Sequence, residues 1–120
     1  MATDMRFLTL VILVSTAASA QSWSGYLVDA RCYAAMERNH NPQSTLMDVN
    51  IDRDSEIRYC RPTAKSNAFS VVLRDGQSFS LDAAGNTKAA ALPKGHILYV
   101  TVKGQMRNRT VTVNSITPTR

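Results

Sequence analysis

Two pairs of alternating apolar segments follow Cys60, and they constrain the fold more than any other feature of the chain. The segments are residues 67–73 and 77–82 around Asp75-Gly76, then residues 96–106 and 110–117 around Arg107-Asn108. Alternation with a period of two is typical of strands that bury one face, and short polar turns between such strands indicate hairpins. We therefore expect two β-hairpins in the second half of the chain.

The register of the first hairpin follows from its large apolar residues. A three-residue loop, 74–76, pairs Val71 with Phe79. The same register pairs Phe69 with Leu81, so that four large apolar side chains share one face. Gly76 would then take the left-handed position of a bulged turn, which glycine adopts at little cost.

The second hairpin is expected to turn at Arg107-Asn108. A two-residue turn there pairs Val102 with Val113 and sets Gly104 opposite Val111. Asparagine tolerates a positive φ better than most residues. A glycine inside a strand often marks a bend or bulge, so we expect the strand to curl at Gly104.

The segment before these hairpins combines one strand with helical stretches. Residues 23–29 read as a strand, and residues 30–39 as a helix with Asp29 as its N-cap. Residues 41–53 show no clear period, and residues 54–60 predict one or two helical turns. A further helical turn is expected within residues 83–94.

Five strands with strong bends predict an all-β fold with a short helical insertion. We expect a small, partly open five-stranded barrel of the OB type, formed by a single domain at residues 21–120. Residues 30–62 would be a helical and irregular excursion from it. A β-sandwich of three and two strands is the alternative.

The first twenty residues predict that the protein is exported from the cytoplasm. Arg6 precedes a short apolar run, Phe7–Val14, and small residues then end at Ala20. This order is typical of a secretory signal peptide, and the run is too short to span a bilayer. We expect cleavage after Ala20 and a secreted or periplasmic chain starting at Gln21, without a transmembrane segment. An N-terminal membrane anchor is the alternative.

Cys32 and Cys60 are the only cysteines of the chain. Two cysteines in an exported chain predict one disulfide. It would close a loop of about 28 residues, worth roughly 3–4 kcal/mol. A pair of metal-binding or redox thiols is the alternative, although the spacing is not that of a C-x-x-C motif.

The net charge of +5 is unevenly distributed. Residues 21–60 carry four basic and six acidic side chains, whereas residues 61–120 carry nine and two. A basic half attracts anionic partners, and an aromatic and basic surface on one barrel face could bind them. The candidate residues are Arg74, Lys103, Arg107 and Arg109, with Phe69, Phe79 and Tyr99.

This surface implies a small ligand, an anionic glycan or another envelope component as partner. Export makes nucleic acid an improbable target, and the domain is expected to be a monomer. Phe69 and Phe79 are also the best core candidates of their strands, which favours a buried position for both. The alternative is a surface with scattered lysines and arginines and no site.

A copper site is the sharpest alternative hypothesis for function. Cys32, Met36 and His40 are spaced to share one helix face, with Met47 beyond them. Sulfur and imidazole ligands suit Cu(I). A bridged Cys32 supplies no thiolate, so the disulfide and this site largely exclude each other.

An acidic stretch resembles the start of a calcium loop but departs from it. Asp48, Asn50 and Asp52 match, whereas Arg53 and Tyr59 stand where glycine and glutamate are required. The acidic cluster of Asp48, Asp52, Asp54 and Glu56 is expected to be a solvated face or helix start, with low-affinity calcium binding as the alternative.

Catalytic motifs are missing from the sequence. There is no G-x-S-x-G, no H-E-x-x-H and no phosphate-binding glycine loop. A pair of Cys60 with His40 or His96 would need a thiol that the disulfide removes. We expect a protein that is not an enzyme and has no cofactor.

Several short motifs resemble a known family. They are Trp23, Gly25, Tyr26, Asp29 and Cys32, then Cys60 before residues 69–76, and the ending 100–104 with 111–116. The chain resembles small exported bacterial proteins of a domain of unknown function, which are related in pattern to periplasmic OB-fold proteins. The resemblance implies the fold and the compartment, and no reaction. It also implies extra Cys and His residues between the matched cysteines, where this chain has only His40.

Overall fold

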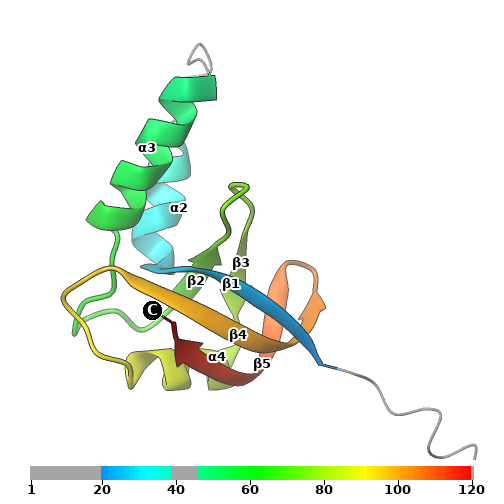
Figure 1. Cartoon of the computed structure of the whole chain (residues 1–120). Helices are drawn as coiled ribbons and strands as arrows, with labels where there is room; N and C mark the ends of the chain where they lie inside the picture. The colour runs from blue at the N-terminus through cyan, green and yellow to red at the C-terminus, as the bar shows by residue number, and fades with distance from the viewer. Residues whose placement is uncertain (1–19, 39–45, 120) are drawn as a thin grey trace, which may run out of the picture.

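Five strands close into one barrel (Figure 1). The computed structural model describes residues 20–38 and 46–119, and within them the side chains from residue 52 onward in the second segment. The strands are β1 (Gln21–Asp29), β2 (Phe69–Val72), β3 (Ser78–Leu81), β4 (Leu98–Arg107) and β5 (Thr110–Pro118). Their order around the barrel is β1-β2-β3-β5-β4, with β1 paired to both β2 and β4.

The strand order confirms a small all-β, OB-like barrel and shows that the β-sandwich alternative was wrong. Every neighbouring pair is antiparallel except β3 and β5, which run parallel. That parallel pair covers only Ser80 with Thr110 and Leu81 with Val111. This short parallel pair closes the barrel. The expectation of a partly open barrel was therefore wrong.

In the described part of the chain, three helices flank the barrel (Figure 1). Helices α2 (Ala30–Arg38) and α3 (Leu46–Tyr59) stand side by side on one end, and α4 (Ala83–Ala90) lies between β3 and β4 in the chain. The expected helix after Asp29 is confirmed. The expectation for residues 41–60 was wrong in extent, because α3 has 14 residues and begins well before residue 54.

The first hairpin has the predicted register. Val71 pairs with Phe79, and Leu73 and Gln77 close a three-residue loop through the Leu73 N–H, which donates to the Gln77 carbonyl over 2.7 Å. Gly76 has a φ of 93°, which is the left-handed position that the loop requires.

The second hairpin has a different register from the predicted one. Its turn residues are Asn108 and Arg109, with φ of 52° and 61°, between Arg107 and Thr110. Two successive positive φ values match the twist of the flanking strands better than an ordinary turn does. Gly104 consequently faces Val113 instead of Val111.

A bulge changes the pairing again further along this hairpin. The register shifts between Lys103 and Gly104, so Val102 lies opposite Ile116 instead of the expected Val113. The bend predicted from Gly104 is therefore confirmed, although its effect on the register was missed. The extra residue is Asn114 in β5, and it lets both Val113 and Ile116 face the barrel interior although they are three residues apart.

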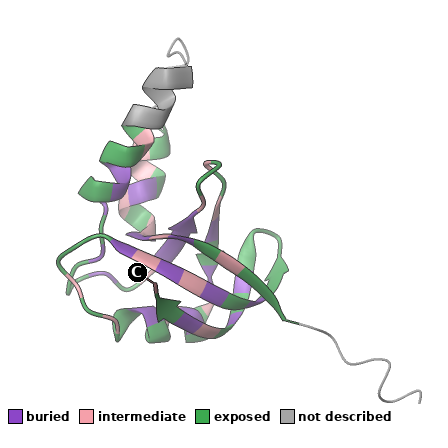
Figure 2. Ribbon diagram, in the orientation of Figure 1, coloured by how far each residue is buried: buried purple, intermediate pink, exposed green. Residues whose placement is uncertain are grey.

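Two apolar clusters stabilise the structure, one inside the barrel and one beneath the helices (Figure 2). The barrel cluster contains Leu27, Phe69, Val71, Phe79, Leu81, Ala89, Leu98, Val100, Val102, Val111, Val113 and Ile116. The second contains Val28, Tyr33, Ile57, Cys60 and Val72. It packs α2 and α3 onto the outer surface of β1 and β2, which gives the helices a defined position over the sheet.

Candidate functional site

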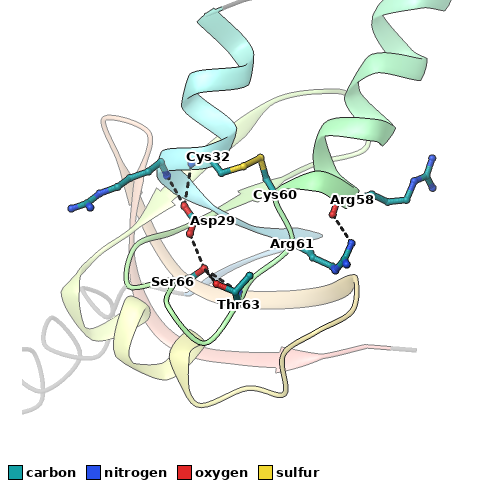
Figure 3. Close-up of a disulfide and its surroundings, with 8 residues drawn as sticks. Asp29, Cys32, Arg58, Cys60, Arg61, Thr63 and Ser66 are labelled. Carbon is teal, nitrogen blue, oxygen red and sulfur yellow. Dashed lines mark hydrogen bonds between the residues drawn. A yellow bond between two sulfur atoms is a disulfide. The ribbon is translucent and has the colours of Figure 1, made fainter.

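The predicted disulfide fixes α2 at its first turn (Figure 3). Cys32 in α2 is bonded to Cys60, which follows α3, and their Cα atoms are 5.5 Å apart. Cys60 is buried in the second cluster, and its carbonyl accepts the Asp29 N–H over 2.8 Å. The bridge therefore ties both helices to the end of β1.

Asp29 caps α2 as predicted and links it to the loop between α3 and β2 (Figure 3). Its Oδ1 accepts the N–H groups of Arg31 and Cys32, at 3.0 and 3.1 Å. Its Oδ2 accepts the Ser66 hydroxyl at 2.7 Å. One carboxylate thus satisfies two free N–H groups of the helix and orients α2.

A groove of about 590 Å³ runs between α2 and the outer face of β2 and β3. Its wall on the helix is formed by Ala30, Arg31, Tyr33, Ala34, Glu37 and Arg38. Its floor and opposite end are formed by Ser70, Ser78, Ser80 and Arg109. The volume lies in the range of clefts that bind small molecules.

Strand alternation places the serines in this groove. Val71 and Phe79 point into the barrel core, so their neighbours Ser70, Ser78 and Ser80 point outward. Ser70 and Ser80 are direct partners across β2 and β3. The floor therefore presents three hydroxyls that each donate and accept hydrogen bonds.

Arg109 reaches the groove from the turn between β4 and β5. Its carbonyl accepts the Ser80 N–H over 2.9 Å, and its Nη2 donates to the Ser78 carbonyl over 2.9 Å. These bonds fix both the backbone and the guanidinium beside β3. A guanidinium has five N–H donors, so Arg109 retains donors for a ligand.

Tyr33 supplies a neutral phenol at the wall of the groove. The pKa of its hydroxyl is raised to about 12, mainly by burial and also by the nearby carboxylates of Glu37 and Glu56, against a smaller opposing effect of Arg53. Desolvation and negative charge both disfavour the phenolate. Tyr33 therefore remains a hydrogen-bonding, uncharged group across the physiological pH range.

We expect Tyr33 to make stability fall at high pH. Its pKa is raised in the folded state, so between the ordinary value of 10.0 and about 12 the folded protein holds a proton that the unfolded chain releases. The free energy of unfolding should be unaffected below pH 10 and decrease above it. Denaturant titrations from pH 9 to about pH 12 measure this slope. Tyr33→Phe should flatten it, and an equal slope in both proteins would refute this cause.

The four basic residues predicted as a ligand surface do not form one site. Arg109 lines the groove, whereas Arg74 lies over the Tyr99 ring, 5.7 Å from its centroid. Tyr99 in turn makes an edge contact with Tyr26 at 4.9 Å, and its hydrogen bond raises the pKa of Arg74. This aromatic and basic contact joins β1, β4 and the loop between β2 and β3, and none of its three residues lines the groove.

The other predicted residues lie elsewhere. Lys103 is exposed on β4, and Arg107 lines a separate hollow of about 460 Å³ with Gln105, Met106, Thr112 and Asn114. Phe69 and Phe79 are in the barrel core, which confirms the prediction that they are buried and not part of a ligand surface. Sequence reasoning missed Arg31 and Arg38, together with the three serines. The alternation of polar and apolar residues in β2 and β3 indicated that these serines point outward. The sequence did not indicate that α2 would lie over them.

Two residues of the copper hypothesis, Cys32 and Met36, are engaged in other interactions. Cys32 is in the disulfide, and Met36 packs against the second apolar cluster. His40 and the Met47 side chain lie outside the described residues. Within the described part, no group of three or more His, Cys, Asp or Glu residues is placed to hold a metal ion.

The calcium-like stretch is helical. Residues 48–59 all belong to α3, so they form no calcium-binding loop. Asp52 and Asp54 are exposed, as expected for a solvated face, but Glu56 is buried near Tyr33. Of the expected solvated face or helix start, the solvated face does not include Glu56, because α3 turns this residue towards α2. The side chains of Asp48 and Asn50 lie outside the described residues.

The N-terminal motif residues have structural roles. Trp23 contacts Phe79 at 5.5 Å between ring centroids. A Cβ on Gly25 would lie 2.5 Å from the Val72 carbonyl oxygen, so β1 and β2 can approach only if this residue is glycine. With the Asp29 cap and the Cys32 bridge, the motif builds the junction between the barrel and the helices.

Comparisons with known proteins identify no relative. No family model, no curated protein and no solved structure matches the chain. Among the described helices, none is both long and apolar enough to cross a bilayer. The predicted signal peptide, residues 1–20, lies outside the described residues except for Ala20.

Proposed function

We propose that this protein is an exported binding module that holds a small ligand in the groove between α2 and the outer face of β2 and β3. The observation that carries this proposal is the composition of the groove: three arginines and three serines line this open hollow of about 590 Å³. Binding clefts use a few placed polar groups to orient a ligand, and these side chains would supply them.

Two structural features support a binding role. Helix α2 is fixed by the disulfide and by Asp29, and the opposite end of the groove is fixed by the hydrogen bonds of Arg109. A site whose walls are held before binding loses little conformational entropy when the ligand enters. The disulfide also fits a protein of the periplasm or the extracellular space, in agreement with the predicted signal peptide.

Native mass spectrometry of the protein purified from its own cell envelope tests this proposal. We expect the mass of a chain that begins at Gln21, lower by two hydrogens because of the disulfide. We also expect a non-covalent adduct of small-molecule size that disappears on denaturation. A chain that retains residues 1–20 and two free thiols would contradict export, and an adduct-free spectrum would contradict ligand binding.

A further inference from the structure

We infer that the ligand carries an anionic group, a carboxylate or a phosphate, on a hydroxylated, sugar-sized framework. This inference rests on the proposed function and assigns a ligand class to the groove. The groove is lined by Arg31, Arg38 and Arg109 and by one carboxylate, that of Glu37. Tyr33 contributes no charge at neutral pH, because a phenol ionises only at a much higher pH. The formal charge of the lining is therefore positive, which attracts an anion.

The arginines face the groove from two sides. Arg31 and Arg38 are seven residues apart on α2, which places them about two turns, or ~10 Å, apart on one helix face. Ala34 lies between them and leaves the space open. Arg109 approaches from the barrel. An anion in the groove can thus receive charge-assisted hydrogen bonds from opposite walls.

The serine floor indicates the rest of the ligand. Ser70, Ser78 and Ser80 lie on the same outer face of neighbouring strands. Each hydroxyl both donates and accepts, which complements the hydroxyls of a sugar better than an apolar framework. A volume of about 590 Å³ accommodates a molecule of monosaccharide to disaccharide size.

The backbone conformation of Arg109 independently supports a role for this residue in ligand binding. This residue is the second of a two-residue turn and has a φ of 61°, a position where glycine is strongly preferred. A side chain in this conformation has an energetic cost, and such residues concentrate at functional sites. The side chain of Arg109 lines the groove. An arginine at a turn position that suits glycine therefore favours a role in ligand binding.

The charge requirement is tested by titrating the oxidised, ¹⁵N-labelled protein with glucuronate, glucose 6-phosphate and neutral glucose. We expect one or both anions to shift amides of the groove and glucose to bind about tenfold more weakly or not at all. The stronger anion distinguishes a carboxylate from a phosphate ligand. Lowering the salt from ~0.1 to ~0.01 M should strengthen anion binding.

Two variants probe the arginines. Arg38→Gln and Arg109→Gly should each weaken anion binding about tenfold or more, because each removes a charged donor. Glycine suits the φ of 61° at residue 109, so Arg109→Gly retains the turn. Arg107→Gln is the matched control, since it removes the same charge from the other hollow, and it should bind normally.

The outcomes of these experiments distinguish an error in the ligand class from an error in the location of the site. Equal binding of glucose and the anions, unchanged affinity in both arginine variants, or the absence of any shift with either anion would overturn the inference. A tryptophan at position 34 should block the groove sterically. If Ala34→Trp abolishes binding while the arginine variants do not, the groove is the binding site but the inference of an anionic ligand is wrong. If Ala34→Trp leaves anion binding intact, the groove itself is the wrong site.

Discussion

Replacing both Cys32 and Cys60 with serine is expected to lower the free energy of unfolding by about 3–4 kcal/mol. The bridge spans 28 residues and joins the first turn of α2 to the segment after α3. Without it, the unfolded chain regains the conformations that the closed loop excluded. For a domain of this size the change corresponds to a decrease in Tm of more than ~10 °C.

Thermal unfolding followed by circular dichroism measures this effect. The double variant avoids a free thiol that would form bridges between molecules, as each single variant would. Wild-type protein in a strong reductant is the control, and its Tm should approach that of the double variant. A Tm that is the same in oxidised, reduced and double-serine protein would show that the bridge does not stabilise the fold.

Phe69→Ala is expected to cost about 3–5 kcal/mol of unfolding free energy. Phe69 is only 1% exposed and belongs to the barrel cluster, so truncation leaves a cavity that the closed barrel cannot fill. Denaturant unfolding measures the difference. Tyr59→Ala is the matched aromatic control, because Tyr59 is 72% exposed and its loss should change the free energy by less than about 0.5 kcal/mol. Similar losses in both variants would contradict the assigned core.

The first hairpin was predictable to the residue because its pattern admits one solution. Phe69, Val71, Phe79 and Leu81 must share a face, and only a three-residue loop achieves this. A slip of one residue would expose the whole set. Local side-chain chemistry therefore specified both the register and the positive φ of Gly76.

The second hairpin lacks such a constraint. Valine and threonine alternate on both strands, so the residue pattern alone does not distinguish turns that start one residue apart. The observed turn at Asn108 and Arg109 depends on contacts with β3, through Ser78 and Ser80. These are contacts between residues distant in sequence. The bulge at Gly104 then restores an inward position for Ile116.

The candidate site was predictable only in part for the same reason. The disulfide and the Asp29 cap follow from local signals, and the structure contains both. The groove depends on where α2 lies over the sheet, which the second apolar cluster determines through Val28, Tyr33 and Val72. No motif encodes that packing. Basic residues were consequently sought on the strands of the second half, whereas two of the three groove arginines are on α2.

The proposed function requires that the groove between α2 and the strands holds the ligand. Native mass spectrometry compares three proteins purified in the same way from the cell envelope: wild type, Ala34→Trp in the groove, and Ala84→Trp on the exposed face of α4. The two variants carry the same substitution at exposed helical alanines. We predict a small-molecule adduct on wild type and Ala84→Trp and none on Ala34→Trp. An adduct on all three proteins, or on none, would contradict the claim.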